Sequence, residues 1–219
     1  MVTDAEYCTL RTEAAVRVPT SVDPASYAPM LCAGVTTYNS LRNMNITAGD
    51  VVAVQGIGGL GHLALQYARK MGFRTVALST SASKRGFAKE LGANDYIDTS
   101  RQNAAEALQK MGGASCIIVT APSPEIMGPL IGGLGPRGKL LILAAVGDIP
   151  VDTVKLMAKG ASVHGWPAGH ALDSEEAISF AQHQNVECLV EEFSFDNVEE
   201  AIRHMDSGNA RFRCVLVME

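Results

Sequence analysis

Residues 50–71 contain the feature that most restricts the fold of this chain, an apolar run that meets four glycines and continues as a helical pattern. Val51–Val54 is continuously apolar and β-branched or small, which is typical of a strand buried on both faces of a parallel sheet. Gly56, Gly58 and Gly61 follow at G-x-G-x-x-G spacing. In this motif the first glycine allows a tight turn, the second lets the backbone approach a pyrophosphate, and the third lets the helix pack closely on the strand. The stretch therefore predicts a dinucleotide site.

The surroundings of the glycine motif support this interpretation. Gly59 adds a further glycine inside the motif, Leu60 precedes its last glycine, and a second β-type run follows the helix at Arg74–Leu78. Phosphates would bind the free N–H groups and the positive dipole end of the helix. The alternative is a glycine-rich turn without a ligand, and the strand before the motif and the helix after it disfavour that alternative.

The composition is ordinary for a cytosolic α/β protein. The chain has 219 residues, more than the usual ~150 per domain, so we expect one domain with an appendage. With 47% hydrophobic residues, 19% charged residues and a net charge of −5, it has no basic footprint for nucleic acid. The cysteines are scattered without a C-x-x-C pair, which indicates reduced thiols. Because no stretch has the pattern of a signal peptide or a bilayer span, we expect a cytoplasmic protein without nucleic-acid or membrane partners.

Apolar periodicity predicts a regular alternation of strands and helices through the middle of the chain. The expected strands are 51–55, 74–79, 95–98, 115–120, 138–144 and 161–165. The expected helices lie near 59–71, 83–91, 102–111, 124–132 and 152–158. Such alternation with short loops predicts an α/β fold with a doubly wound parallel sheet, in the strand order 3-2-1-4-5-6, with a cofactor crevice at the carboxyl ends of the first strands.

The two ends of the chain do not follow this alternation. Short strands are expected at 5–10 and 14–18, and a helix is expected over 24–42. After Gly165 we expect a helix opening at Asp173, a strand at 189–195, a capped helix at 196–208 and a closing strand at 210–218.

Four segments carry a resemblance to a known family. They are LCAGVTTYNSLR at 31–42, GDVVAVQGIGGLGHLALQYARKMG at 49–72, GPRGKLLILAA at 135–145 and ARFRCVLVM at 210–218. Together they resemble the medium-chain, zinc-type alcohol dehydrogenases, especially the cinnamyl-alcohol and yeast-type branch. The resemblance implies a Rossmann domain flanked by segments of a catalytic domain that is mostly missing here.

This resemblance suggests a division of the chain into three parts. Residues 1–47 would be a remnant of the catalytic domain with a connecting helix, 48–170 the dinucleotide-binding Rossmann domain, and 171–219 C-terminal helices with a closing strand. Residues 1–4 stand where the family has a glycine-rich lead-in, so we expect a chain that naturally begins here.

Zinc ligation is the point at which the chain departs from the family pattern. Family members bind catalytic zinc through an early Cys, a His-Glu pair, and a Cys or acid in the stretch that matches LCAG, and only the last has a counterpart, Cys32. A catalytic zinc site needs about three protein ligands, so we interpret Cys32 as a small buried thiol. His62 follows the last glycine, at a helix start that points at the cofactor, and for every histidine a surface or core role is favoured over a ligand role. The remaining histidines, His164, His170, His183 and His204, have no metal spacing, and we predict no bound zinc.

The residues after the second strand predict the choice of cofactor. An NAD site places an acid there to bind the ribose 2′-hydroxyl, but this chain has Ser79. Hydroxyls of Ser79, Thr80 and Ser81, followed by Lys84 and Arg85, would accept a 2′-phosphate, so the predicted cofactor is NADP(H). In the alternative, Ser81 or Ser83 only caps the next helix and both cations are solvated.

Further cofactor contacts are implied by the family resemblance. Thr36 would face the nicotinamide, Val119–Ala121 together with Ala145 and Val146 would line it, and Arg213 would reach the pyrophosphate. Arg211 is the weaker candidate, because alternation along the closing strand puts both arginines on one face and only one can be nearest the phosphates.

Two classes of function remain open. The first is a zinc-independent oxidoreductase that transfers hydride to or from a carbonyl or enone, with Thr36, Thr37 or Tyr38 as the local proton donor. The second is a degenerate dehydrogenase without redox activity, used as a binding module or reused to act on a small molecule in the vacated cleft. A fragment of a longer enzyme is a third possibility.

An exposed sheet edge predicts the state of assembly. Ala161–Gly165 would be the sixth strand at the edge of the sheet, without a guarding lysine or proline, and Trp166 follows it. In the resembling family two such edges pair across a two-fold axis, so we expect a homodimer. A monomer shielded by the helix at 171–184 is the alternative.

Overall fold

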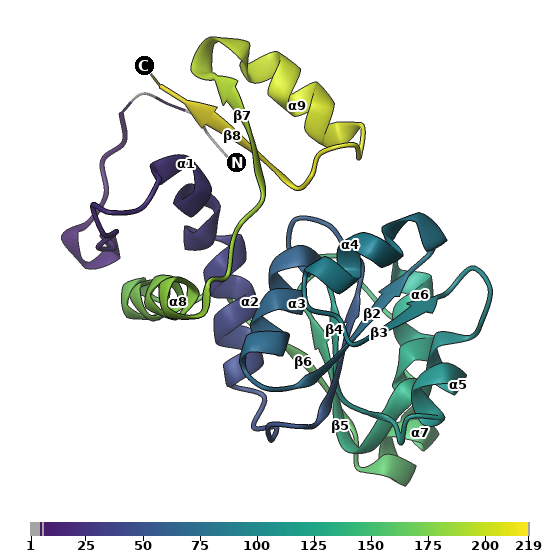
Figure 1. Ribbon diagram of the computed structural model, residues 1–219. Helices are drawn as coiled ribbons and strands as arrows, with labels where there is room; N and C mark the ends of the chain where they lie inside the picture. The colour runs from purple at the N-terminus through teal and green to yellow at the C-terminus, as the bar shows by residue number, and fades with distance from the viewer. Residues whose placement is uncertain (1–4, 6, 219) are drawn as a thin grey trace.

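The centre of the molecule is a six-stranded parallel sheet, seen in a computed structural model that describes residues 5 and 7–218 (Figure 1). Its strand order is β3-β2-β1-β4-β5-β6, and every neighbouring pair is parallel. The strands are β1 (Val51–Gln55), β2 (Arg74–Ser79), β3 (Asp95–Asp98), β4 (Ala114–Val119), β5 (Leu134–Ile142) and β6 (Ser162–Gly165). The predicted doubly wound sheet and its order are therefore confirmed.

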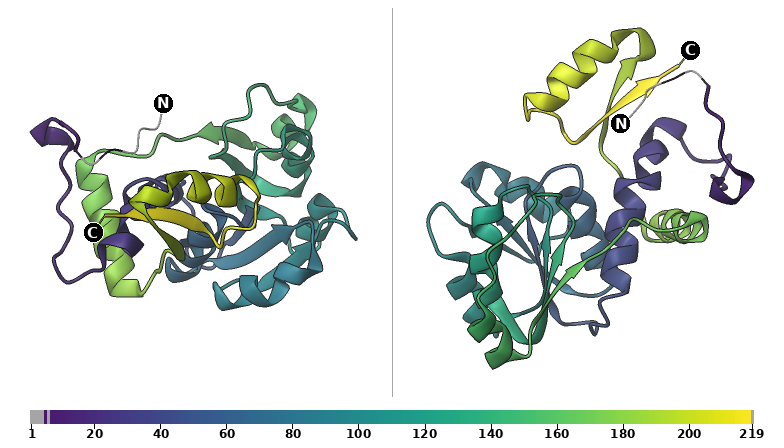
Figure 2. Two further views of the ribbon diagram at one scale, coloured as in Figure 1. Left: turned by 90° about the horizontal axis from the view of Figure 1, so that it is seen from above. Right: turned by 180° about the vertical axis from the view of Figure 1, so that it is seen from behind.

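Alternating side chains of the central strands build one hydrophobic core on each face of the sheet. In β1, Val52 and Val54 belong to one core and Ala53 to the other, and all three are fully buried. Burial on both sides explains why β1 is apolar without a polar alternation. The first core is covered by α2 (Ala33–Arg42), α3 (Gly61–Lys70) and α4 (Arg85–Glu90), and the second by α5 (Ala104–Gln109), α6 (Pro124–Leu130) and α7 (Thr153–Lys159). Figures 1 and 2 show these two helical layers on opposite faces of the sheet.

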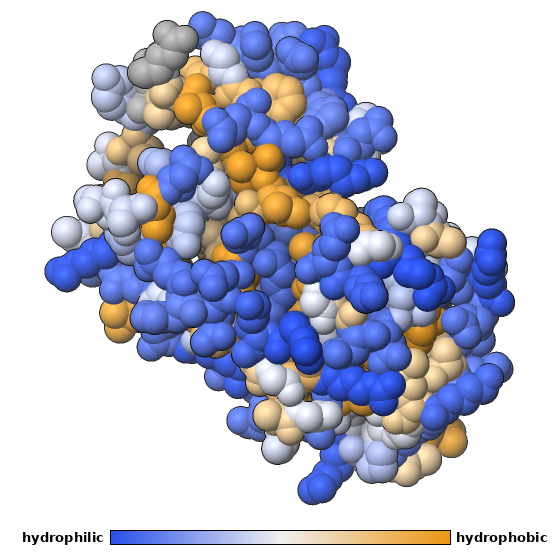
Figure 3. All heavy atoms as spheres, in the orientation of Figure 1, coloured by the Kyte–Doolittle hydropathy of each residue, from blue (hydrophilic) through white to orange (hydrophobic). Residues whose placement is uncertain are grey.

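A smaller lobe stands beside the Rossmann domain and is built from both ends of the chain (Figures 1 and 2). Its two-stranded parallel sheet pairs β7 with β8, and α1 contacts both strands. The elements outside the main sheet are α1 (Pro24–Tyr27), α8 (Ala171–Gln184), β7 (Val190–Ser194), α9 (Val198–Asp206) and β8 (Arg213–Val217). Short 3-10 turns lie at Thr12–Ala14, Ala28–Leu31, Ala82–Lys84, Ile131–Gly133 and Phe195–Asn197. In Figure 3, apolar side chains gather on the visible face where this lobe meets the Rossmann domain.

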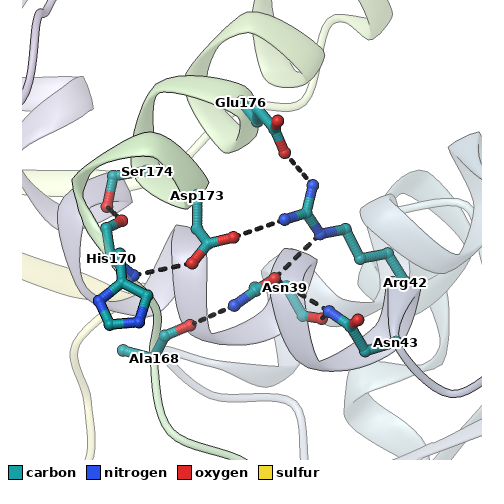
Figure 4. Close-up of polar contacts among 8 residues, drawn as sticks. All are labelled: Asn39, Arg42, Asn43, Ala168, His170, Asp173, Ser174 and Glu176. Carbon is teal, nitrogen blue, oxygen red and sulfur yellow. Dashed lines mark hydrogen bonds and ion pairs between the residues drawn. The ribbon is translucent and has the colours of Figure 1, made fainter.

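A polar cluster fastens α8 to α2 (Figure 4). The Arg42 guanidinium donates to Asp173, at 2.5 Å between Nη2 and Oδ1, and also pairs with Glu176. Its Nε donates to Asn39 Oδ1 at 2.9 Å. The second oxygen of Asp173 accepts the backbone N–H of His170, which closes the capping box at the start of α8. One arginine therefore ties the helix before the sheet to the helix after it.

The expected strands near the N-terminus are wrong. Residues 5 and 7–10 form no strand, and neither does 14–18; position 6 lies outside the described residues. Most of these side chains are exposed, and the Arg17 N–H donates to the Glu175 side chain at 3.0 Å instead of to a neighbouring strand. Among the described residues no neighbouring strand pairs with these segments, so their alternating apolar residues do not form a strand.

The helix expected over 24–42 is interrupted. It is divided into α1, a 3-10 turn that contains Pro29, and α2, which begins after Cys32. Proline has no N–H to donate inside a helix, and Cys32 leaves the helical region with φ −125° and ψ −74°.

Among the described residues, no helix has both the length and the apolar character needed to cross a membrane.

Candidate dinucleotide site

The principal cavity lies at the carboxyl ends of β1, β2 and β4 and has a volume of about 680 Å³. This is the crevice where an open α/β sheet binds its ligand. Most of the predicted cofactor residues line it, namely Gly56, Gly58, Gly59, Leu60, Ser79, Thr80, Lys84 and Ala121. Strand ends far apart in the sequence therefore converge on one site.

The glycines of the loop have distinct steric environments. Gly56 adopts φ +90°, and a Cβ there would lie 2.9 Å from Ala121 Cβ. A Cβ at Gly61 would lie 1.9 Å from the Gly56 carbonyl oxygen, so Gly61 does not line the cavity but lets α3 pack against the loop. A Cβ at Gly58 would meet nothing within 4 Å. Gly58 therefore keeps open the space in front of the helix start, as its position in the motif predicts.

A small polar group follows β2. Ser79 ends that strand, and Ser81 accepts a hydrogen bond from the Ser83 N–H at 3.2 Å, so Ser81 caps the following turn and does not line the cavity. Lys84 does line it, and Lys84 Nζ donates to the Ile57 carbonyl at 3.2 Å across the site. Burial, with a smaller effect of the Arg211 charge, lowers the pKa of Lys84 below its ordinary value.

Arg85 does not join this group, so its expected place in the anion site is wrong. The guanidinium lies over the Tyr96 ring, 4.9 Å from the centroid, and lines a different hollow. The stacking partner is a residue of β3, and it draws the side chain away from the cavity.

Of the two arginines near the closing strand, Arg213 is the one beside the glycine loop. A Cβ on Gly59 would lie 2.8 Å from Arg213 Nη1, so the guanidinium rests against the loop. Arg211 instead donates from Nη1 to the carbonyls of Asn209 and Ala210, at 3.0 and 3.1 Å, and lies before β8 begins. The preference for Arg213 agrees with this geometry.

The predicted residues on α2 and after β5 do not line the cavity. Thr36 and Tyr38 are two positions apart, about 200° around the helix, so they cannot share a face. Tyr38 packs against Tyr67 and Phe180, with centroids 5.5 and 5.2 Å away, and is therefore unsuited to the expected role of proton donor. Thr36 is half-buried. Ala145 is exposed and Val146 half-buried, in the loop after β5.

His62 takes a core role, the alternative that the sequence favoured over a ligand role. Its ring is fully buried, stacked on Phe212 at 4.7 Å between centroids, on the side of the C-terminal lobe. Burial is the main cause that lowers the pKa of His62 to about 4.

The donor set of the described residues does not fit a catalytic zinc. Cys32 is exposed rather than buried, and no group of three His, Cys, Asp or Glu side chains within 5 and 7–218 could hold a metal ion. His164 and His204 have other partners, Ser162 at 2.8 Å and Glu191 at 2.6 Å.

Several lining residues were missed by the sequence interpretation. They follow β3 and β4, and they are Thr99, Gln102, Asn103, Ser123 and Glu125. The rule that places ligands at the carboxyl ends of parallel strands would have found them, because each follows a correctly predicted strand.

The parallel sheet and the glycine-lined crevice are those of a Rossmann-type fold. The sequence pattern of the zinc-binding dehydrogenases matches residues 59–183, which is more than half of the chain. The chain therefore belongs to that family of alcohol dehydrogenase-like, medium-chain proteins. An alcohol dehydrogenase, patD, of Penicillium expansum is 58% identical over 98% of this chain and 63% of its own length. The patD protein of Aspergillus clavatus is 48% identical over 98% of this chain and 68% of its own.

Solved structures agree with this assignment. A cinnamyl alcohol dehydrogenase of Sorghum bicolor matches 92% of this chain and 57% of its own, with 29% identity and a TM-score of 0.81. The chain thus spans about two thirds of the length of the relatives it matches.

Proposed function

We propose that this chain binds NADP(H) in the crevice at the carboxyl ends of β1, β2 and β4. The observation that carries the proposal is the pairing of Ser79, where an NAD site needs an acid, with Lys84, whose ammonium lines the same cavity. A 2′-phosphate there would accept charge-assisted hydrogen bonds from Lys84 and the neighbouring hydroxyls. Arg213 and the loop amides supply positive charge for the pyrophosphate.

Calorimetry with the two reduced cofactors tests this proposal. NADPH should bind at least ~10-fold more tightly than NADH, the effect of one charge-assisted contact of ~1.4 kcal/mol. Lys84→Ala should erode the preference and leave NADH binding unchanged. Arg85→Ala is the matched control, because its guanidinium stacks on Tyr96 outside the cavity. Equal affinities of the wild type for both cofactors would refute the choice of NADP(H).

We propose further that the chain exchanges hydride with a small carbonyl compound, enone or alcohol, without zinc. The nicotinamide, when bound, supplies or accepts the hydride. Among the local hydroxyls, Thr37 already donates to the Ala33 carbonyl at 2.8 Å, and the Tyr38 ring is packed against Tyr67. Thr36 is then the hydroxyl of α2 best suited to hydrogen-bond the reacting oxygen. Support for the reaction class comes from relatives named alcohol dehydrogenases.

A second candidate is a degenerate dehydrogenase that binds the dinucleotide without redox chemistry, or acts on a small molecule by another reaction. Within the part of the chain that the structure describes, it is favoured by the poor metal donor set and by the single suitable hydroxyl of α2. NADPH oxidation across a panel of aldehydes and enones, with a chelator present, separates the two. Turnover supports the oxidoreductase, whereas tight NADPH binding without turnover supports the second candidate.

We propose a homodimer formed through β6. This strand is at the edge of the sheet, its residues 162–164 are half-buried, and Trp166 follows it. Light scattering should give twice the monomer mass for the wild type. Val163→Pro removes an edge donor and should yield monomers. A wild type that is monomeric at micromolar concentration would end the proposal.

A further inference from the structure

His62 lies directly beneath the glycine loop and has two hydrogen-bond partners in different parts of the fold. Its Nδ1 is 3.1 Å from the Gly58 carbonyl oxygen, and its Nε2 accepts the Leu189 N–H at 3.2 Å. Leu189 belongs to the segment that joins α8 to β7 and leads to the small lobe (Figure 1). Hydrogen bonds from this segment to His62 and Gln66 connect it to α3. One buried side chain therefore bridges the loop and the connection between the two parts of the molecule.

The two partners determine the form of the ring. A backbone N–H can only donate, so Nε2 must be the unprotonated acceptor. A carbonyl can only accept, so Nδ1 must carry the proton and donate it to Gly58. The lowered pKa of His62, caused mainly by burial, agrees with a neutral ring. His62 is thus held as the Nδ1–H tautomer.

This tautomer orients one peptide of the loop. The Gly58 carbonyl accepts two hydrogen bonds from His62, one from its ring and one from its backbone N–H at 3.0 Å. In a trans peptide the following N–H points opposite to the carbonyl, so the Gly59 N–H is turned away from His62. Gly59 lines the cavity, and its amide is one of those that a pyrophosphate would use.

The same ring is linked to the arginine of the site. The Leu189 carbonyl accepts the backbone N–H groups of Phe212 and Arg213, at 3.0 and 3.2 Å. The Arg213 guanidinium rests against Gly59. A closed path therefore runs from Gly58 through His62 and Leu189 to Arg213 and back to the loop.

We propose that His62 is a positioning residue of the dinucleotide site, which holds the Gly58–Gly59 peptide and the Arg213 guanidinium in register for one pyrophosphate. The role rests on the proposed cofactor binding and extends it to a side chain that never touches the ligand. His62→Phe keeps a stacking ring but removes both hydrogen bonds.

Gln66 offers a matched control one helical turn away on α3. Its side-chain amide exchanges two hydrogen bonds with the Glu187 backbone, at 2.8 and 2.9 Å, and its Nε2 also donates to the His62 carbonyl at 3.2 Å, but it makes no hydrogen bond to Gly58 or Gly59. Gln66→Leu therefore loosens the connecting segment without releasing Gly58.

Binding measurements on the full chain separate these effects. His62→Phe should weaken NADPH binding about 10-fold, the scale of one buried hydrogen bond. The same variant should keep its affinity for 2′-AMP, which lacks a pyrophosphate, within about 2-fold of wild type. Gln66→Leu should keep its affinities for both NADPH and 2′-AMP within about 2-fold. Combined with Arg213→Met, the loss from His62→Phe should shrink, because both act on one pyrophosphate contact. Three results would overturn the proposal. They are unchanged NADPH affinity in His62→Phe, an equal loss of NADPH affinity in His62→Phe and Gln66→Leu, and losses from His62→Phe and Arg213→Met that add fully in the double variant.

Nitrogen NMR of the wild-type histidine rings supplies a test that needs no variant to fold. At pH 7 we expect a buried ring protonated at Nδ1 and unprotonated at Nε2. A ring protonated at Nε2 would overturn the proposal. If wild-type protein bound neither NADPH nor NADH while the Nδ1–H tautomer was present, the proposed function would fail and this inference would fail with it. Binding that is insensitive to His62 would remove this inference alone.

Discussion

Two glycines of the same loop should respond in opposite ways to one added methyl group. Gly61→Ala would place Cβ 1.9 Å from the Gly56 carbonyl oxygen, so α3 and the loop must move apart by more than an ångström. Overpacking of this kind costs about 3 kcal/mol or more, even with the better helix propensity of alanine. For a chain of this size the melting temperature should fall by about 6 to 12 °C.

Gly58→Ala has no such conflict, because its Cβ would meet nothing within 4 Å and its φ is not in the left-handed region. Stability should stay within about 1 kcal/mol of wild type, and the entropy of the unfolded chain favours the alanine slightly. The methyl group would occupy the space of the pyrophosphate, so NADPH affinity should fall at least ~10-fold.

Thermal unfolding and calorimetry on both variants check this pair. The reasoning would be refuted by a Gly61→Ala protein as stable as wild type, or by a Gly58→Ala protein that unfolds globally. In the second case Gly58 would serve packing and not the ligand.

Two further predictions concern α2. In steady-state assays, Thr36→Val should slow carbonyl reduction about 100-fold, the lower range for the loss of a proton-donating group. Tyr38→Phe should leave turnover within about 2-fold of wild type. The reverse order of the two effects would show that Tyr38 reaches the substrate. Arg42→Ala should lower stability by about 1 kcal/mol, or 2 to 4 °C, since its partly exposed ion pairs are screened by solvent. Arg74→Ala should cost less, because Arg74 is more exposed than Arg42 and pairs with Asp95 alone. Equal shifts in a thermal melt would argue against a role of the Arg42 cluster in joining α8 to α2.

The Rossmann part of the fold could be predicted because each of its strands has a partner supplied by the same repeating pattern. β2 was expected at 74–79 and β3 at 95–98, and both have those bounds. The N-terminal segments carry a similar apolar alternation but lack a neighbouring strand among the described residues, so the pattern alone misled. Local propensity indicates a strand only where a sheet exists to receive it.

The candidate site, like the fold, could be predicted only in part. Ser79, Lys84 and the glycines were placed by their distance along the chain from a strand end, which the parallel topology converts into a place in space. The directions of Arg85 and His62 depend on Tyr96 and Phe212, aromatic partners that come from other elements. No spacing rule contains those contacts, so Arg85 was expected in the anion site, and the orientation of the His62 ring could not be predicted.

The burial of His62 leads to a prediction about acid stability. Its pKa is lowered from 6.5 to about 4 in the folded protein, mainly by burial, so below pH 6.5 the unfolded chain takes up a proton that the folded chain refuses. Stability therefore falls as the pH decreases from 6.5 to 4, by about 2.5 kcal/mol at pH 4.5. Carboxylates with a lowered pKa, such as Glu191, contribute stability that is complete above their ordinary pKa. Their contribution is therefore lost at lower pH than that of His62.

Urea unfolding of the ligand-free protein at pH 7 and pH 4.5 isolates this contribution. His62→Gln keeps a donor and an acceptor but cannot titrate, so it should lose less than about 1 kcal/mol over the interval in which the wild type loses about 2.5. His183→Gln, on the exposed face of α8, is the control and should match the wild type. Parallel losses in wild type and His62→Gln would mean that other groups govern the acid response. They would also mean that the ring below the glycine loop is not held neutral by its burial against Phe212.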